Sequence, residues 1–140
     1  MKTIILSSFA IILSLFSTQA QAQEKHETEK RNYIVLTRKI PQLKPIILTA
    51  KSLAEEDGHH FGDFQVVVCG KTVSGLQDKE KMAPYLEMAE EAGVHIKACG
   101  FSLKKFETDP DKLPKEIEVV KNGLLHNFRL QKKGYLSIEL

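Results

Sequence analysis

The two cysteines of this 140-residue chain are the residues best suited to covalent chemistry, and they occupy equivalent places. Cys69 closes an apolar run at 64–69, Cys99 closes a segment at 94–99 that alternates apolar and polar residues, and each is followed directly by glycine. Such β-branched runs are typical of strands in a parallel sheet. Because chemistry in open parallel sheets gathers outside the carboxyl ends of the strands, we expect both thiols in one site at that edge.

Cys99 is the stronger candidate for a reactive thiol. The segment 101–106 predicts a short helix with Ser102 near its start. Unpaired N–H groups at a helix N-terminus stabilise a thiolate and lower its pKa. Gly100 would let the backbone turn closely around the thiol. The alternative is that Cys99 is buried and inert, and packs as a small hydrophobic side chain.

Cys69 is the weaker candidate, because its strand is already apolar and the segment 70–79, from Gly70 onward, is expected to be a loop. A role in the core is the main alternative for Cys69. A third interpretation joins it to Cys99 in a disulfide, as in many exported proteins. Neighbouring strands about 4.8 Å apart would allow that bridge. No Cys-x-x-Cys motif is present, so a thioredoxin-like site is excluded.

The elements that must position these thiols alternate regularly between strand and helix. Strands are expected at 33–36, 64–69, 94–98, 117–120 and 135–139, with helices at about 45–57, 82–92, 101–106 and 124–133. In the last helix, Leu124, Leu125 and Phe128 are expected to form the buried face. This order predicts a three-layer α/β/α fold, with a mostly parallel sheet of about five strands and helices on both faces.

The N-terminus has the pattern of a secretory signal peptide at 1–22. Lys2 precedes an apolar stretch at 4–16, and Ala20-Gln21-Ala22 fits a cleavage site. The apolar stretch is shorter than the roughly 20 residues that a membrane-spanning helix needs, which disfavours an anchor. We therefore expect a periplasmic or secreted protein, with a polar lead-in at 23–31 and one domain at 32–140.

Composition excludes several classes of partner. The formal charge is +2, and it falls to +1 without the signal peptide, which contains one lysine and no acid. A near-neutral chain without a basic block does not indicate nucleic acid or a membrane surface. His59 and His60, with Asp57 and Asp63 nearby, lack metal-ligand spacing and are read as a polar loop. No metal or other cofactor is expected, and His126 has no evident partner.

Several segments together resemble the DsrE/DsrF-like family, over most of the chain after residue 60. The matching segments are 66–70, 86–93, 94–103, 119–120, 122–123 and 134–138. The segment Ala98-Cys99-Gly100, with Ser102 and Leu103 after it, is the most specific of them. The resemblance implies a five-stranded parallel sheet between helices, assembly into homotrimers or homohexamers, and a cysteine that carries persulfide sulfur in a relay.

Three hypotheses for function follow. The first is an exported DsrE-like protein that handles reduced sulfur through Cys99 as the accepting thiol, with a thiol or persulfide partner protein. The second is a non-catalytic oligomeric binding module in which both cysteines are structural. The third is a thiol–disulfide switch that uses Cys69 and Cys99 together.

Overall fold

The computed structural model describes residues 30–140, so the signal peptide expected at 1–22 lies outside the described residues. Most of the expected polar lead-in, 23–31, also lies outside them. Its last residue, Arg31, was wrongly assigned, because Arg31 begins strand β1 (Arg31–Thr37). The Arg31 guanidinium donates a hydrogen bond to the buried carboxylate of Asp57. The bond to Asp57, which lies 26 residues later in the chain, thus makes the charged residue Arg31 part of the folded domain.

The domain is built on one five-stranded sheet in which every strand pair is parallel. The strand order is β4-β3-β2-β1-β5. The strands after β1 are β2 (Phe61–Val68), β3 (Val94–Cys99), β4 (Glu118–Val120) and β5 (Leu136–Glu139). The parallel α/β architecture expected from the sequence is therefore confirmed.

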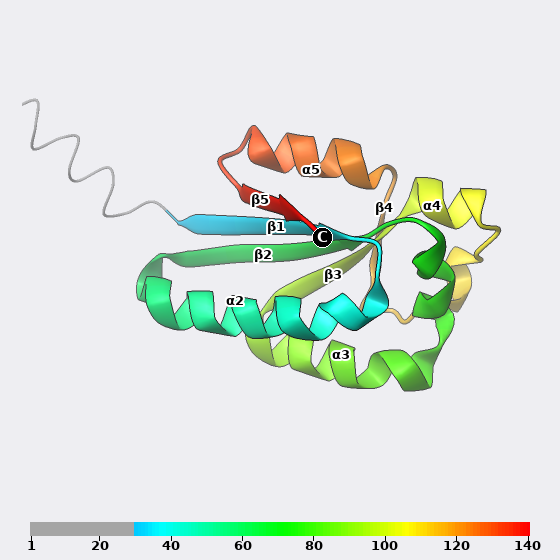
Figure 1. The fold of residues 1–140 in the computed structure, drawn as a ribbon, viewed down its shortest axis with the longest axis horizontal. Coiled ribbons are helices and arrows are strands. Elements are labelled where there is room, and N and C mark those ends of the chain that lie inside the picture. Colours follow the sequence, from blue (N-terminus) through cyan, green and yellow to red (C-terminus); the bar gives the residue numbers. More distant parts are fainter. Residues whose placement is uncertain (1–29) are drawn as a thin grey trace, which may run out of the picture. The chain divides into compact units, whose positions relative to one another are not determined.

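Helices cover both faces of the sheet (Figure 1). Helices α2 (Leu43–Asp57) and α3 (Lys79–Ala92) pack on one face, over the larger apolar core. Helix α5 (Gly123–Gln131) packs on the other face, over a smaller cluster that includes both cysteines. The short helix α4 (Gly100–Lys105) follows β3 directly. None of the helices within 30–140 has the length and apolar character to span a membrane.

The segment after β2 is more ordered than the expected loop. Residues Lys71–Gln77 form a 3-10 helix, because Val73 and Leu76, three positions apart, are both fully buried. Residues three apart line up on one side of a 3-10 helix, so burial of this pair favours that geometry. The helix fixes the course of the chain immediately after Cys69 and Gly70.

The buried face of α5 differs from the expected one. Leu124, Leu125 and Phe128 are 51%, 44% and 59% exposed, so their assignment to the core was wrong. The residues of α5 that are buried are Gly123, Asn127 and Leu130. Because Gly123 has no side chain, the start of α5 can lie close to the sheet. The helix therefore turns Gly123, Asn127 and Leu130 toward the sheet and leaves the larger apolar side chains exposed.

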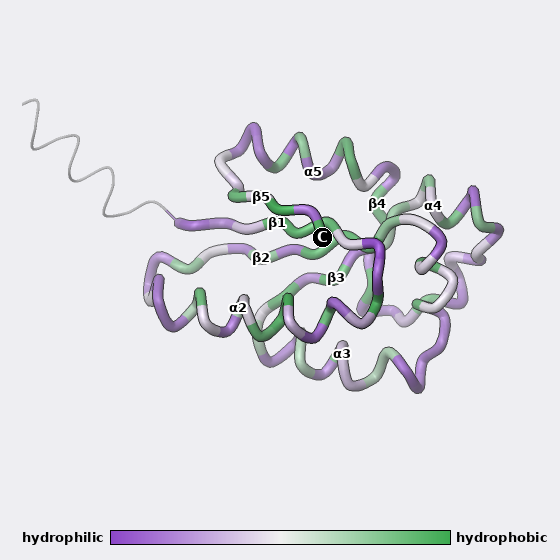
Figure 2. Tube along the Cα trace, in the orientation of Figure 1, coloured by the Kyte–Doolittle hydropathy of each residue, from purple (hydrophilic) through white to green (hydrophobic). Residues whose placement is uncertain are grey.

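Strand β5 forms an edge of the sheet and is exposed along its length. Leu136 and Ile138 are 62% and 57% exposed. They pair in register with Tyr33 and Val35, whose side chains belong to the core under α2, so they share that face of the sheet. Figure 2 shows β5 beginning as a hydrophobic segment. The α2 layer therefore leaves an apolar strip of the sheet uncovered.

Candidate functional site

The two cysteines lie side by side at the carboxyl end of the sheet. Strands β2 and β3 are neighbours in which Val68 pairs with Ala98, and a cysteine follows each of these residues. Both cysteines are free thiols, 7% and 5% exposed for Cys69 and Cys99 respectively. The two thiols affect each other, because Cys99 raises the pKa of Cys69 and Cys69 lowers the pKa of Cys99. The structure thus brings the two thiols into one site.

Polar groups of α4 and α5 lie around the Cys99 sulfur. The backbone N–H of Gly123, at the start of α5, donates to Cys99 Sγ over 3.3 Å. The hydroxyl and the backbone N–H of Ser102, in the first turn of α4, also lower the pKa of Cys99. The Ser102 Oγ in turn accepts a hydrogen bond from the Gly70 N–H at 2.8 Å. Groups from three separate segments therefore gather around one sulfur atom.

These surroundings shift the pKa values of the two thiols in opposite directions. Burial raises the pKa of Cys99, but the hydrogen bonds from Ser102, Gly123 and Cys69 together outweigh it and leave the pKa below its ordinary value. Burial, the charge of Cys99 and donation to Cys99 raise the pKa of Cys69 to about 12. Cys99 therefore loses its proton before Cys69, and any negative charge on the pair resides on Cys99.

A small cavity of about 230 Å³ gives access to the two thiols. It is lined by Leu36, Arg38, Cys69, Gly70, Cys99, Phe101, Ser102, Asn122 and Leu124. At its mouth, Phe101 and Leu124 are 57% and 51% exposed, and Arg38 pairs with Glu139 at 2.9 Å. The cavity is large enough for one side chain or a few added atoms on a sulfur, and too small for a folded element.

Gly123 belongs to this candidate site, and the sequence alone did not identify it. A Cβ at this position would lie 2.6 Å from Cys69 Sγ and 2.9 Å from Val67 Cγ1. The absence of a side chain allows the start of α5 to approach the thiols, so that its N–H reaches Cys99. The signal available in the sequence was the pair Asn122-Gly123, in which Asn122 caps α5 by accepting from two backbone N–H groups.

The other expected site residues lie where the sequence placed them. Gly70 adopts φ = 76°, a left-handed conformation that favours glycine, and directs its N–H to Ser102. Gly100 packs closely against backbone, since a Cβ there would lie 3.1 Å from the carbonyl oxygens of Val120 and Lys121. Both glycines therefore shape the loops around the thiols.

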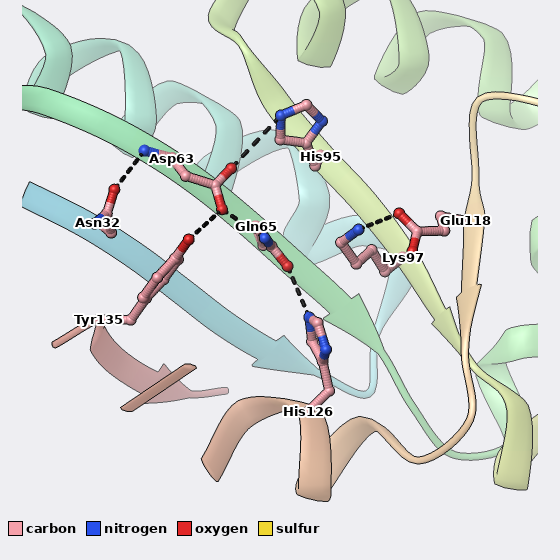
Figure 3. Close-up of polar contacts among 8 residues, drawn as sticks. All are labelled: Asn32, Asp63, Gln65, His95, Lys97, Glu118, His126 and Tyr135. Atoms are coloured by element: carbon pink, nitrogen blue, oxygen red, sulfur yellow. Dashed lines mark hydrogen bonds and ion pairs between the residues drawn. The ribbon is translucent and has the colours of Figure 1, made fainter. Parts of the chain in front are cut away.

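A second polar cluster occupies the same sheet face farther from the carboxyl edge (Figure 3). Its members are Asn32, Asp63, Gln65, His95, Lys97, Glu118, His126 and Tyr135. His126, which had no expected partner, binds Gln65 through its Nε2 at 2.8 Å. Lys97 is almost buried and pairs with Glu118 from β4. Residues 30–140 contain no group of three or more His, Cys, Asp or Glu side chains arranged to hold a metal ion.

A hollow more voluminous than the thiol cavity lies away from the thiols. It measures about 1070 Å³ and is lined by α3, the start of β3 and residues 113–116. It contains neither cysteine, and the side chains that line it include His95 but no hydrogen-bonded cluster around a nucleophile. The smaller cavity beside Cys99 is therefore the candidate site, because there a nucleophile and its hydrogen-bond donors meet.

Comparisons with known proteins identify the fold. No protein-family model and no curated protein matches the sequence. A protein of unknown function from Methanobacterium thermoautotrophicum is 20% identical, with a TM-score of 0.59 over 80% of this chain and 100% of that one. Another, from Bacteroides thetaiotaomicron, is 13% identical, with a TM-score of 0.59 over 78% of this chain and 94% of that one. The chain thus shares its parallel α/β fold with these two proteins.

Proposed function

We propose that this protein accepts and passes on sulfane sulfur through Cys99. The observation that carries the proposal is the hydrogen bond that Cys99 Sγ receives from the Gly123 N–H, together with the lowered pKa of Cys99, to which Ser102, Gly123 and Cys69 contribute. These groups stabilise a thiolate, which is the nucleophilic form of cysteine. The resemblance to the DsrE/DsrF-like family, centred on Ala98-Cys99-Gly100, supports the same chemistry.

The transfer has two balanced steps. The Cys99 thiolate attacks the outer sulfur of a donor persulfide, R–S–SH, to form a persulfide on Cys99 and release the donor thiolate. An acceptor thiolate then attacks the outer sulfur on Cys99, which leaves as the free thiolate again. No net oxidant is consumed. The cavity beside Cys99 accommodates the added sulfur atom, and the same hydrogen-bond donors stabilise Cys99 when it leaves.

Persulfide loading tests the proposal directly. After incubation with an organic persulfide and removal of the excess, intact mass spectrometry should show the gain of one sulfur atom, located by peptide mapping on Cys99. The Cys99→Ser variant should lose this gain completely, whereas Cys69→Ser should retain most of it. A wild-type protein that gains no sulfur, or a Cys99→Ser variant that gains as much, would contradict the proposal.

A thiol–disulfide switch is the second candidate, and the position of Cys69 and Cys99 at the ends of two adjacent strands favours it. Exchange with a partner disulfide, which is reduced and leaves as two thiols, would join Cys69 and Cys99 in a disulfide between adjacent strands. The difference in acidity gives this switch one nucleophilic thiol and one protonated thiol. A non-catalytic binding module is the remaining alternative, and the inertness of both thiols after reduction would favour it.

We also propose export and self-assembly. Export follows from the signal-peptide pattern at 1–22, and it would place the protein in the periplasm or outside the cell. Self-assembly into a homotrimer or homohexamer follows from the family resemblance, and the apolar strip of Leu136 and Ile138 supports it. A closed ring needs two unlike surfaces on each subunit, and exposed Leu125 and Phe128 on α5 supply a second one.

Light scattering at micromolar concentration should give three or six times the monomer mass for the purified protein. Ile138→Asp should lower that mass to one subunit, because it places a charge in the apolar strip. Ser74→Asp, which adds the same charge at another exposed position, serves as the matched control and should keep the assembled mass. A monomeric wild-type protein, or an Ile138→Asp variant that still assembles, would count against this arrangement.

A further inference from the structure

The segments around the thiol cavity are strongly biased in charge. The segments 37–42, 69–77, 99–106 and 120–125 follow or close the four strands β1 to β4 at their carboxyl ends. Together they contain six basic residues and no Asp or Glu, although the whole chain has 20 basic and 18 acidic residues. We call these six exposed residues the basic rim: Arg38, Lys39, Lys71, Lys104, Lys105 and Lys121.

The positive charge of the basic rim is little neutralised within the protein. Arg38 forms an ion pair with Glu139, at the end of β5. The other five residues make no ion pair within residues 30–140. Charges of one sign around a pocket attract ligands of the opposite sign and raise their association rate by about 10- to 1000-fold. The basic rim therefore favours the binding of an anionic ligand near Cys99.

The apolar mouth of the cavity indicates what kind of anion this is. Phe101 and Leu124 both line the cavity and are more than half exposed, so they offer apolar contact area outside it. A small inorganic anion would make no use of that area. A protein segment could, because its cysteine side chain would enter the 230 Å³ cavity while neighbouring residues lie on the mouth and the rim.

We propose that the basic rim docks a partner protein segment in which a thiol or persulfide is flanked by acidic residues. The proposal rests on the function proposed above for Cys99, and it names the substrate class of that site. The partner's acidic side chains lie against the rim lysines, its cysteine enters the cavity, and Phe101 and Leu124 contact the adjoining backbone and side chains. The same charges direct the approach of the donor and speed the encounter.

Mixed-disulfide peptides test this recognition without the natural partner. The peptides Glu-Glu-Cys-Glu-Glu, Ser-Ser-Cys-Ser-Ser and Lys-Lys-Cys-Lys-Lys each carry thionitrobenzoate on the cysteine. The Cys99 thiolate attacks the peptide sulfur, forms a Cys99–peptide disulfide and releases the coloured thionitrobenzoate anion. The rate of thionitrobenzoate release is measured, and peptide mapping confirms that Cys99 is the modified residue.

The acidic peptide should react at least about tenfold faster than the basic peptide at low ionic strength. High salt should remove most of this difference, because it screens charges beyond a few ångströms. The double variant Lys71→Glu/Lys121→Glu should abolish or invert the preference. The matched control Lys132→Glu/Lys133→Glu, which changes two exposed lysines at the far end of α5, should leave it unchanged.

Two further probes separate the possible failures. Neutral dipyridyl disulfide reports whether Cys99 is a nucleophile at all, and no reaction would overturn both the proposed function and the docking proposal. Normal reaction with this probe but equal rates for the three peptides would overturn the docking proposal alone. Leu124→Ser should slow the acidic peptide severalfold and the small dianionic Ellman's reagent little. If Leu124→Ser slowed the acidic peptide and Ellman's reagent equally, the basic rim would be a site for small anions, and the proposal of a protein partner would be overturned.

Discussion

Iodoacetamide should label Cys99 at least about fiftyfold faster than Cys69 near neutral pH. The pKa of Cys69 is raised to about 12 and that of Cys99 lies below its ordinary value. Since an ordinary thiol has a pKa of about 8.5, the thiolate fractions differ by more than about a thousandfold. Nucleophilicity falls as pKa falls, with a Brønsted coefficient of about 0.4–0.5, so the expected ratio of rates is smaller.

Labelling of each cysteine is measured by peptide mass spectrometry over a pH series. Ser102→Ala should move the midpoint of Cys99 labelling to higher pH, because it removes a donor to the sulfur. Ser74→Ala, which removes an exposed hydroxyl bound to its own 3-10 turn, is the matched control. Faster labelling of Cys69 would refute the assignment. Labelling that requires prior reduction would instead support the disulfide switch.

The sequence predicted the fold because its strands follow strong local rules. The run 64–69 is apolar and β-branched, its counterpart 94–99 alternates apolar and polar residues, and both end in Cys-Gly. Because parallel strands end at one edge, these two endings alone predicted that the thiols meet. The expected alternation of strand and helix was enough to give the sheet with helices on both faces.

The orientation of α5 was not predictable from apolar spacing. Leu124, Leu125 and Phe128 have the spacing of a buried face, but packing selects Gly123 and Asn127 instead. A close approach between a helix start and two thiols requires a missing side chain, and hydropathy patterns give no weight to glycine. The sequence therefore placed the right helix over the sheet with the wrong side inward.

The acidity of Cys99 was expected in direction, but its cause was only partly identified. The sequence supported a helix N-terminus after Cys99, and α4 does begin at Gly100, with Ser102 in its first turn. The hydrogen bond from Gly123 comes from a residue 24 positions later in the chain. A contact of that range depends on how β4 and α5 return to the sheet, which a local pattern does not contain.

The Gly123→Ala variant should be less stable than the wild type by about 1–3 kcal/mol, the usual cost of adding a methyl group to a packed site. The new Cβ would lie 2.6 Å from Cys69 Sγ, so the start of α5 must move away from the sheet. That movement also lengthens the hydrogen bond from the Gly123 N–H to Cys99 Sγ. Labelling of Cys99 should therefore require a higher pH, in addition to the loss of stability.

Gly75→Ala is the matched control for this prediction. A Cβ at Gly75 meets only the end of the Ile40 side chain, at 2.8 Å, and that side chain can rotate away. Urea unfolding should place the midpoint of Gly75→Ala close to that of the wild type and the midpoint of Gly123→Ala clearly below it. Equal stability of the two variants, with unchanged Cys99 labelling, would show that Gly123 does not hold α5 against the thiols. A stable Gly123→Ala variant whose Cys99 labels only at higher pH would separate the electrostatic role of this N–H from its role in packing.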